Sequence, residues 1–255
     1  MKVSIVTVCY NSEKYIRYAI ESVLSQDYPN IEYIIIDGGS KDNTLAIINE
    51  YADRISVIVS EPDKGIYDAM NKGLKLATGE VVAALNSDDM YSNNQIISMV
   101  VNLFETTGCN IVYGDLQFVK ADDISKIVRT WVTKPFVPGS FKRGWHPPHP
   151  TFFVRNAVYK QYGYFNIRYT LAADFELMLR FLEKYQVSSS YLNYPMVLMR
   201  TGGASGVASS FIKRNTEVIQ SFKINELKIS ILYPFFRFLP KLFNIIRNKI
   251  PKKKQ

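Results

Sequence analysis

Two adjacent carboxylates, Asp88 and Asp89, follow an unbroken apolar run at residues 81–85, with Asn86 and Ser87 in between. A run without alternation is typical of a strand that is buried on both faces of a parallel sheet. Ligands of open α/β sheets bind at the carboxyl ends of the strands, and two acids placed there repel each other unless a cation joins them. Mg²⁺ and Mn²⁺ prefer carboxylate oxygens and bridge to substrate phosphates. The alternative is an Asp pair that caps a helix beginning near Ser92.

Polar residues at two other strand ends suit a nucleotide. Asp37 could accept a hydrogen bond from a base N–H. The alternative is that it caps the following helix and forms hydrogen bonds within the loop at residues 38–40. Lys64 and Gly65 could bring a cation and a bare backbone to a diphosphate, or form a plain turn. Asn71 lies on one helix face with two charged neighbours, a pattern that is also typical of a solvated face. The patterns GxGxxG and GxxxxGK[ST] are absent, so the dinucleotide and P-loop fingerprints fail.

The elements that must position these residues alternate along the first half of the chain. Strands are predicted at residues 3–9, 32–36, 55–59 and 81–85, and helices between them at about 16–24, 44–49 and 67–77. Such a series with short connections favours a parallel sheet with right-handed crossovers. Beyond it we expect a strand at 110–114, a hairpin of 116–120 and 126–131, a helix from Leu171, a strand at 196–200 and a helix at 210–226.

Composition sets the limits of the interpretation. The 255 residues are 47% hydrophobic and 21% charged, which suits one α/β domain with a large core. Both cysteines, Cys9 and Cys109, lie in apolar segments, so we expect a reducing compartment and no disulfide framework. The N-terminus begins with a strand-like run, and no uncharged apolar stretch reaches about 18 residues. We therefore expect neither a signal peptide nor a transmembrane helix.

The net charge of +8 comes from the C-terminal part of the chain. Residues 1–210 carry 20 Lys and Arg against 21 Asp and Glu, whereas residues 211–255 carry 11 against 2. The last 29 residues, 227–255, mix bulky apolar side chains with spaced cations, and Pro234 and Pro240 interrupt any long helix. This pattern favours attachment to a membrane surface, with a terminal helix packed on the domain as the alternative. Nucleic-acid binding is not expected, because the near-neutral part carries acids at its strand ends.

Four stretches in this order, 6–11, 37–44, 61–73 and 86–89, resemble the successive motifs of family 2 glycosyltransferases. The resemblance covers about residues 1–205, and it is strongest to bacterial enzymes that build surface polysaccharide. It implies the α/β GT-A fold, in which helices flank a Rossmann-like, mostly parallel sheet. It also implies an inverting sugar transfer that depends on Mg²⁺ or Mn²⁺.

The resemblance assigns roles to single residues. Asp37 would bind the nucleobase, commonly uracil. Asp89 would hold the metal and Asp88 would face the ribose or the metal-diphosphate, but the chain lacks a strict D-x-D, so which acid is the direct ligand stays open. The other expected donor-binding residues are Thr7, Tyr10, Asn11, Lys64, Gly65, Asn71, His149 and Arg200.

Asp174 is the expected catalytic base, because the family carries its base in an acidic motif at this place. A carboxylate at a helix start is held by backbone N–H groups and stays ionised at neutral pH, although an N-cap role is the plainer alternative. General base catalysis of this kind contributes about 10² to 10⁴ in rate. Glu176 points roughly 200° further round the helix and is the weaker candidate.

These inferences predict one enzyme with an attached tail. Residues 1–210 would form the GT-A domain, with 1–114 binding the nucleotide-sugar and 115–210 the acceptor, and 211–255 would be a basic amphipathic tail. The reaction would move one sugar, from UDP-sugar, to a lipid-linked glycan acceptor in polysaccharide, O-antigen or capsule synthesis. The protein would be cytoplasmic and peripheral on the inner face of the cell membrane. The alternatives are a non-catalytic scaffold of the same fold and a sugar nucleotidyltransferase.

Overall fold

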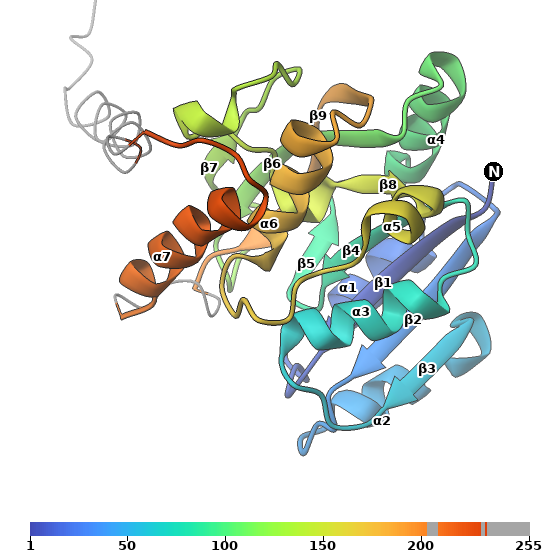
Figure 1. Cartoon of the computed structure of the whole chain (residues 1–255). Coiled ribbons are helices and arrows are strands. Elements are labelled where there is room, and N and C mark those ends of the chain that lie inside the picture. The colour runs from blue at the N-terminus through green and yellow to red at the C-terminus, as the bar shows by residue number, and fades with distance from the viewer. Residues whose placement is uncertain (203–208, 231–232, 234–255) are drawn as a thin grey trace, which may run out of the picture.

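The computed structural model of the chain describes residues 1–202, 209–230 and 233, with the side chains of 209–211 left aside. Its first half alternates strands and helices as expected (Figure 1). The elements in order are β1 (Val3–Cys9), α1 (Ile16–Leu24), β2 (Ile31–Asp37), α2 (Thr44–Asn49), β3 (Val57–Ser60), α3 (Ile66–Leu76) and β4 (Val81–Asn86).

The second half is more irregular, with short strands and single helical turns between longer elements. Two 3₁₀ turns, Phe141–Arg143 and His149–Thr151, lie in its long central loop, and a π-helical turn at Arg180–Lys184 extends α6. The remaining elements are β5 (Asp89–Tyr91), α4 (Ile96–Thr107), β6 (Ile111–Val119), β7 (Ile127–Trp131), β8 (Phe153–Arg155), α5 (Asn156–Tyr162), α6 (Ala173–Leu179), β9 (Ser189–Arg200) and α7 (Ser209–Ile224).

All nine described strands join one sheet in the order β3-β2-β1-β4-β8-β6-β9-β5, with β7 on the side of β6. The pairs β1–β2, β1–β4 and β2–β3 are parallel, which confirms the expected parallel half. Beyond β4 the pairing is mixed: β8 is antiparallel to both neighbours, whereas β6 and β9 run parallel. The fold is therefore the expected α/β sheet flanked by helices.

Several boundaries differ from the sequence-based expectation. The strand expected at 110–114 and the first hairpin strand are one strand, β6, in which the register with β9 shifts around Gly114 and Asp115. The strand expected at 196–200 begins already at Ser189. Asp89 opens a short strand, β5, and the next helix begins at Ile96 rather than near Ser92, so the acid pair does not cap that helix.

The sheet is covered on both faces by apolar helices. Alternate side chains of β1 and β2 point to opposite faces, as the period of a strand requires. Val6 and Ile34 join the core beneath α3 and α6, whereas Ile5 and Ile35 join the core beneath α1 and α4. Full burial of each such side chain contributes about 1.5–3 kcal/mol, so these two layers fix where the strands end.

The first part of the expected tail packs into this domain. Helix α7 lies beside α6 (Figure 1). Its residues Val218 and Phe222 are fully buried, and Leu227 and Ile229 pack against the same core. Helix α7, which we expected as the first part of the tail beyond residue 210, therefore contributes to the core of the domain. Most of the expected membrane-attaching segment, 227–255, lies outside the described residues. Among the helices that are described, none is long and apolar enough to cross a membrane.

Gly73 sets how closely α3 approaches the sheet. A methyl group added at this position would overlap the Val6 side chain and would lie 3.2 Å from Cγ1 of Ile36. Both neighbours belong to the central parallel strands, so they cannot move without disturbing the strand ends. The close approach of α3 brings its first turn to the carboxyl edge of the sheet.

We expect Gly73→Ala to lower the free energy of unfolding by about 1–3 kcal/mol, because overpacking forces backbone shifts. Urea denaturation would measure the loss. The control is Leu76→Ala on the same helix, because Leu76 is 43% exposed and should cost much less. A Gly73→Ala protein as stable as wild type would contradict the close packing of α3 on β1.

Glu32 joins three segments at the opposite, amino edge of the parallel strands. Its side chain accepts hydrogen bonds from Lys2 Nζ (2.7 Å), Ser4 Oγ (2.5 Å) and the backbone N–H of Thr78 (2.8 Å). Burial by itself would raise the pKa of Glu32, but these donors outweigh it and lower the pKa to about 2. The ionised form therefore stabilises the folded state.

The contribution of Glu32 should depend on pH in a defined direction. Because its folded pKa is depressed, its stabilisation is complete above the unfolded pKa and is lost as the pH falls toward about 2. We expect wild type to melt above Glu32→Gln at neutral pH and the gap to close between about pH 5 and pH 2. Thermal melting of both proteins across this range measures it. A gap that stays constant with pH would contradict the assigned hydrogen bonds.

Candidate functional site

The carboxyl ends of three parallel strands form one edge. Cys9 of β1 lies beside Asp37 of β2, and Val8 lies beside Asn86 of β4. The turns that follow these strands therefore start at the same level. This is the edge at which open α/β sheets bind ligands.

Asp37 is fully buried at the end of β2, where its carboxylate is already hydrogen-bonded. Its Oδ2 accepts from Ser60 Oγ at 2.6 Å and from the backbone N–H of Ser40 at 3.1 Å, and Oδ1 accepts from Ser40 Oγ. These bonds hold the carboxylate in one orientation. A nucleobase that approached it would have to share or replace one of the serine donors.

Hydrogen bonds join the turn after β1 to the turn after β2. Asn11 has a positive φ of 48°, and its side-chain oxygen accepts from the backbone N–H of Lys41 at 2.9 Å. Its own N–H donates to Ser40 Oγ at 2.8 Å. The ring of Tyr10 is 61% exposed beside this junction. An exposed ring next to polar backbone suits the stacking of a base.

Two of the expected donor-binding residues point elsewhere. Thr7 is fully buried, and its hydroxyl accepts a hydrogen bond from the Tyr33 hydroxyl at 3.1 Å. Asn71 is 8% exposed, and its amide makes two 2.9 Å hydrogen bonds with the backbone of Phe165. The structure does not bring either side chain to the exposed edge, and Asn71 does not lie on a solvated face.

Lys64 and Gly65 form an exposed turn at the start of α3. The N–H of Lys64 donates to Asp68 Oδ2 at 2.9 Å, and that of Gly65 donates to Asp63 Oδ1 at 2.8 Å. Gly65 has φ of 112°, and no atom lies within 4 Å of the place where its Cβ would stand. The turn thus offers open backbone, with the Lys64 side chain exposed to solvent.

The two acids after β4 differ in exposure. Asp88 is partly exposed, and burial raises its pKa, an effect that the charge of Arg200 opposes. Asp89 is fully buried, and burial followed by the charge of Asp88 raises its pKa well above the usual range. Asn86 donates to Asp89 Oδ2 at 2.9 Å, whereas Oδ1 is buried without a hydrogen-bond partner among the described residues.

Arg200, one of the expected donor-binding residues, is a cation next to this acid pair. It ends β9, which pairs antiparallel with β5 and so carries the residue to Asp89. Its guanidinium lies 4.7 Å from the ring centres of both Tyr15 and Tyr18 and donates to the Ala121 carbonyl at 2.8 Å. It is 5% exposed, so its charge acts on the acids in a poorly solvated environment.

The acid pair fits a divalent ion of the Mg²⁺ or Mn²⁺ class. Such ions are held by one or two carboxylates, while substrate phosphates and water complete the shell. The orphaned Oδ1 of Asp89 and the raised pKa values of both acids indicate a site short of positive charge. Within the described ranges no cluster of three or more His, Cys, Asp or Glu could hold a metal alone.

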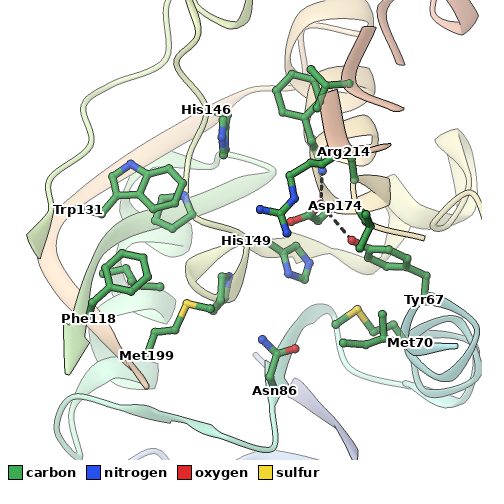
Figure 2. Close-up of a pocket in the computed structure, with 18 of the residues that line it drawn as sticks. Tyr67, Met70, Asn86, Phe118, Trp131, His146, His149, Asp174, Met199 and Arg214 are labelled. Atoms are coloured by element: carbon green, nitrogen blue, oxygen red, sulfur yellow. Dashed lines mark hydrogen bonds between the residues drawn. The ribbon is translucent and has the colours of Figure 1, made fainter. Parts of the chain in front are cut away.

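A pocket of about 390 Å³ opens between the sheet edge and the second half of the chain (Figure 2). Asn86 of β4 forms its floor, and α3, the β6–β7 hairpin, the 146–150 loop, α6 and α7 supply its walls. The labelled residues of Figure 2 are Tyr67, Met70, Asn86, Phe118, Trp131, His146, His149, Asp174, Met199 and Arg214.

Asp174 is partly exposed on the wall of this pocket, in the first turn of α6. Its Oδ1 accepts from the Tyr67 hydroxyl at 3.2 Å and from the backbone N–H of Phe175 at 2.8 Å. Both bonds go to the same oxygen, so Oδ2 has no hydrogen-bond partner in the part of the chain that the structure describes. A carboxylate held in this way can accept a proton from a hydroxyl group in the pocket.

Glu176, the weaker candidate for the base, is not available for this task. It is 3% exposed, and its carboxylate accepts from Arg180 Nε at 3.0 Å and from Asn225 Nδ2 at 2.9 Å. It thus joins α6 to α7 on the side of the helix away from the pocket.

His149 lines the pocket beside Asp174, as Figure 2 shows. Burial lowers the pKa of its ring, and the charge of Asp174 offsets part of that shift. The ring packs edge-on against Phe165 at 5.4 Å between centres. A neutral imidazole is therefore the expected form at neutral pH, one that offers a single N–H donor.

Several pocket residues were not among those predicted from the sequence. Tyr67 and Asn86 lie within motifs that the sequence did reveal, but neither was given a role. The alternation of its strand would predict that Trp131 lines the pocket only if the hairpin were already known to face the pocket. Arg214 enters from α7, a segment that was assigned to the tail, and no local pattern marks it. Its side chain points toward Asp174 and His149 (Figure 2).

This combination of fold and site defines a class of enzyme: glycosyltransferases of the GT-A type that use nucleotide-sugar donors. The chain belongs to glycosyl transferase family 2, whose family model matches residues 4–165. The resemblance noted in the four sequence motifs is thereby confirmed.

Curated relatives agree with this membership. A PGL/p-HBAD biosynthesis glycosyltransferase of Mycobacterium bovis is 27% identical over 225 residues, covering 83% of this chain and 82% of its own length. An uncharacterized glycosyltransferase of Mycobacterium tuberculosis is 30% identical over 180 residues, covering 70% and 68%. Both alignments are longer than the region that the family model matches, and each includes most of this chain.

Solved structures show the same fold at low sequence identity. TarS of S. aureus superposes with a TM-score of 0.70 at 22% identity, covering all of this chain and 76% of that one. A mannosyltransferase of Pyrobaculum calidifontis, solved in complex with GDP-Man and Mn²⁺, gives a TM-score of 0.65 at 17% identity, again covering 100% and 76%. TarS has also been solved in complex with UDP-GlcNAc.

The coupling between Arg200 and the buried acid can be measured in metal-free buffer. We expect Arg200→Met to lower the free energy of unfolding by about 1–3 kcal/mol, because the acids lose their nearby positive charge. In an Asp89→Asn background the same change should cost at least about 0.5 kcal/mol less. Urea denaturation of wild type, the two single variants and the double variant completes this double-mutant cycle. Contacts of Arg200 with Tyr15, Tyr18 and Ala121 cancel in it, so strictly additive costs would contradict the coupling.

Proposed function

We propose that this protein is an inverting glycosyltransferase that moves one sugar from a nucleotide-sugar, in the first instance a UDP-sugar, to an acceptor hydroxyl. The observation that carries the proposal is the position of Asn86. This residue bonds to Asp89 at the nucleotide edge and also forms the floor of the pocket that contains Asp174. A donor whose diphosphate lies at the acid pair can therefore place its sugar in front of Asp174.

The chemistry assigned to the pocket is a single displacement. The acceptor oxygen attacks the anomeric carbon and forms the new C–O bond, while the bond from that carbon to the phosphate oxygen breaks. The nucleoside diphosphate leaves with the bonding electron pair, and Asp174 takes the acceptor's hydroxyl proton. Attack opposite to the leaving group inverts the anomeric configuration. Tyr67 holds Oδ1 of Asp174, and the second oxygen is available for the proton.

The nucleotide is assigned to the edge formed by β1, β2 and the turn before α3. Asp37 would accept from the base N–H, the Tyr10 ring would cover the base, and Asn11 would bond to the ribose. Lys64 and the open backbone of Gly65 would lie near the diphosphate. Thr7 and Asn71 would act behind this surface, through their hydrogen bonds with Tyr33 and Phe165.

Asp88 and Asp89 would hold Mg²⁺ or Mn²⁺ together with phosphate oxygens of the donor. A bound divalent ion supplies charge stabilisation for the departing diphosphate. Arg200 adds a second positive charge from the neighbouring strand, and His149 offers one N–H donor from the pocket side. Asp88 is partly exposed and Asp89 is fully buried, so Asp88 is the more accessible of the two acids.

The acceptor is proposed to be a lipid-linked glycan at the inner face of the cell membrane, in surface polysaccharide synthesis. Support comes from the excess of cations in residues 211–255, which suits an anionic surface. A relative that is named a PGL/p-HBAD biosynthesis glycosyltransferase is consistent with a role in a biosynthetic pathway that glycosylates its product.

A donor screen tests the proposal. Purified protein with Mn²⁺ is offered UDP-, GDP- and dTDP-sugars, and release of the nucleoside diphosphate is followed. We expect release from one donor class, and we expect Asp174→Asn to lower kcat by about 10² to 10⁴ because the base is lost. Donor affinity, measured by calorimetry, should stay within a few fold of wild type.

Asp53→Asn is the control, because Asp53 is exposed in a turn of the nucleotide half and should change neither quantity. Unchanged kcat in Asp174→Asn would contradict its role as the base. If direct binding detects no nucleotide-sugar at all, the protein is a non-catalytic scaffold of this fold instead.

A further inference from the structure

A carboxylate from α7 reaches the turn that begins α6. Glu217 accepts hydrogen bonds from the backbone N–H groups of Thr170 (3.1 Å), Leu171 (2.8 Å) and Ala172 (2.9 Å), and from Thr170 Oγ1 (3.1 Å). Its side chain is 6% exposed. Three consecutive backbone donors thus converge on one buried carboxylate that lies 45 residues further along the chain.

From this contact we propose that Glu217 is a positioning residue for Asp174, so that α7 is part of the catalytic machinery. The inference rests on the proposed role of Asp174 as the base. Glu217 does not touch the pocket itself. It holds the backbone at Ala172, which lies two residues before Asp174, and so fixes the position of Asp174.

The start of α6 has no capping side chain of its own. Its N-cap residue is Ala172, which has no polar side chain, and Glu217 instead fixes the backbone N–H groups of the residues that lead into the helix. Hydrogen bonds from backbone N–H groups to an ionised acceptor are stronger than neutral ones. Because three of them fix successive residues, they determine the direction in which the first turn of α6 leaves the loop.

That first turn carries Asp174. The carbonyl of Ala172 accepts from the N–H of Glu176 at 3.0 Å, so the residue held by Glu217 is also the first link of the helix. A displacement there moves Asp174 relative to Tyr67 and to the floor of the pocket at Asn86. Misplacement of a catalytic group by about 1 Å can cost up to 10²-fold in rate.

The support itself is firmly held. Val218 and Phe222, the residues on the inner face of α7, are fully buried against α6 (Figure 1). Directly after the end of α7, Asn225 donates to Glu176 of α6 at 2.9 Å. The two helices are thus joined at both ends of their contact. One turn before Glu217, the Arg214 side chain enters the pocket, so a shift of α7 would change two walls at once.

Glu32 provides a matched control for a purely structural role. It is 7% exposed, and it also accepts several hydrogen bonds, but it lies at the amino edge of the sheet, away from the pocket. Both Glu217→Gln and Glu32→Gln should lower the melting temperature. Only a residue that positions the base should also lower turnover at a temperature at which the protein is folded.

The experiment compares kcat and donor KM of Glu217→Gln, Glu32→Gln and wild type, well below the melting point of each. In Glu217→Gln an amide NH₂ faces backbone N–H groups, so the turn must shift. We expect kcat to fall roughly 10- to 100-fold with donor KM within about twofold, because the nucleotide edge is untouched. Glu32→Gln should keep the wild-type kcat. Equal kcat in all three proteins would overturn the inference.

Two further measurements separate this inference from the proposed function. The double variant Asp174→Asn/Glu217→Gln should be no slower than Asp174→Asn alone, because both changes act through one group. If Asp174→Asn leaves kcat unchanged, the proposed base is wrong. If Asp174→Asn is slow but Glu217→Gln is as fast as wild type, only the positioning role fails.

Should Glu217→Gln not fold, Glu217→Asp keeps the charge but withdraws it by one methylene group. We expect an intermediate fall in kcat and faster hydrogen exchange at the amides of residues 170–172, which can be followed without substrate. Wild-type kcat together with wild-type exchange in Glu217→Asp would overturn the proposal.

Discussion

The parallel pairing of β1 with β2 and β4 is the constraint on which the site depends. Since Cys9 is opposite Asp37 and Val8 is opposite Asn86, three turns start at one level, and the polar residues that follow share one edge. Two apolar layers fix this register, because a shift by one residue would turn every buried side chain of a strand to the other face. Gly73 lets α3 lie close enough to add its first turn to the same edge.

The acids at this edge are costly to bury, and the second half of the sheet offsets part of that cost. β9 runs antiparallel to β5, and this pairing brings Arg200 next to Asp88 and Asp89. One oxygen of Asp89 still has no partner among the described residues. Arg200 balances the negative charge of the acids only in part. A divalent ion with phosphate ligands would balance the remainder. The stability of the free protein and its affinity for a nucleotide are thereby linked.

The first half of the fold could be predicted from the sequence because its signals are local: apolar runs, turn residues and acids directly after the strands. Asp37 and Asp88 were singled out in this way, whereas Asp174 was singled out by its place at a helix start together with the family resemblance. The directions of the Thr7 and Asn71 side chains could not, because they depend on Tyr33 and Phe165, which are distant in the sequence. Glu217 and Arg214 carry no local pattern. Their place follows from the packing of α7 on α6, and the basic composition of residues 211–255 obscured it.

We propose that one continuous site joins the nucleotide edge to the pocket of Asp174. A crystal structure of the protein with Mn²⁺ and an unreactive analogue of the preferred nucleotide-sugar tests it most directly. We expect the base to lie beside Tyr10 and Asp37, the diphosphate and metal at Asp88 and Asp89, and the sugar in the pocket. The face of the anomeric carbon opposite the diphosphate should be turned toward Asp174. A nucleotide bound away from the strand ends, or a sugar outside this pocket, would contradict it.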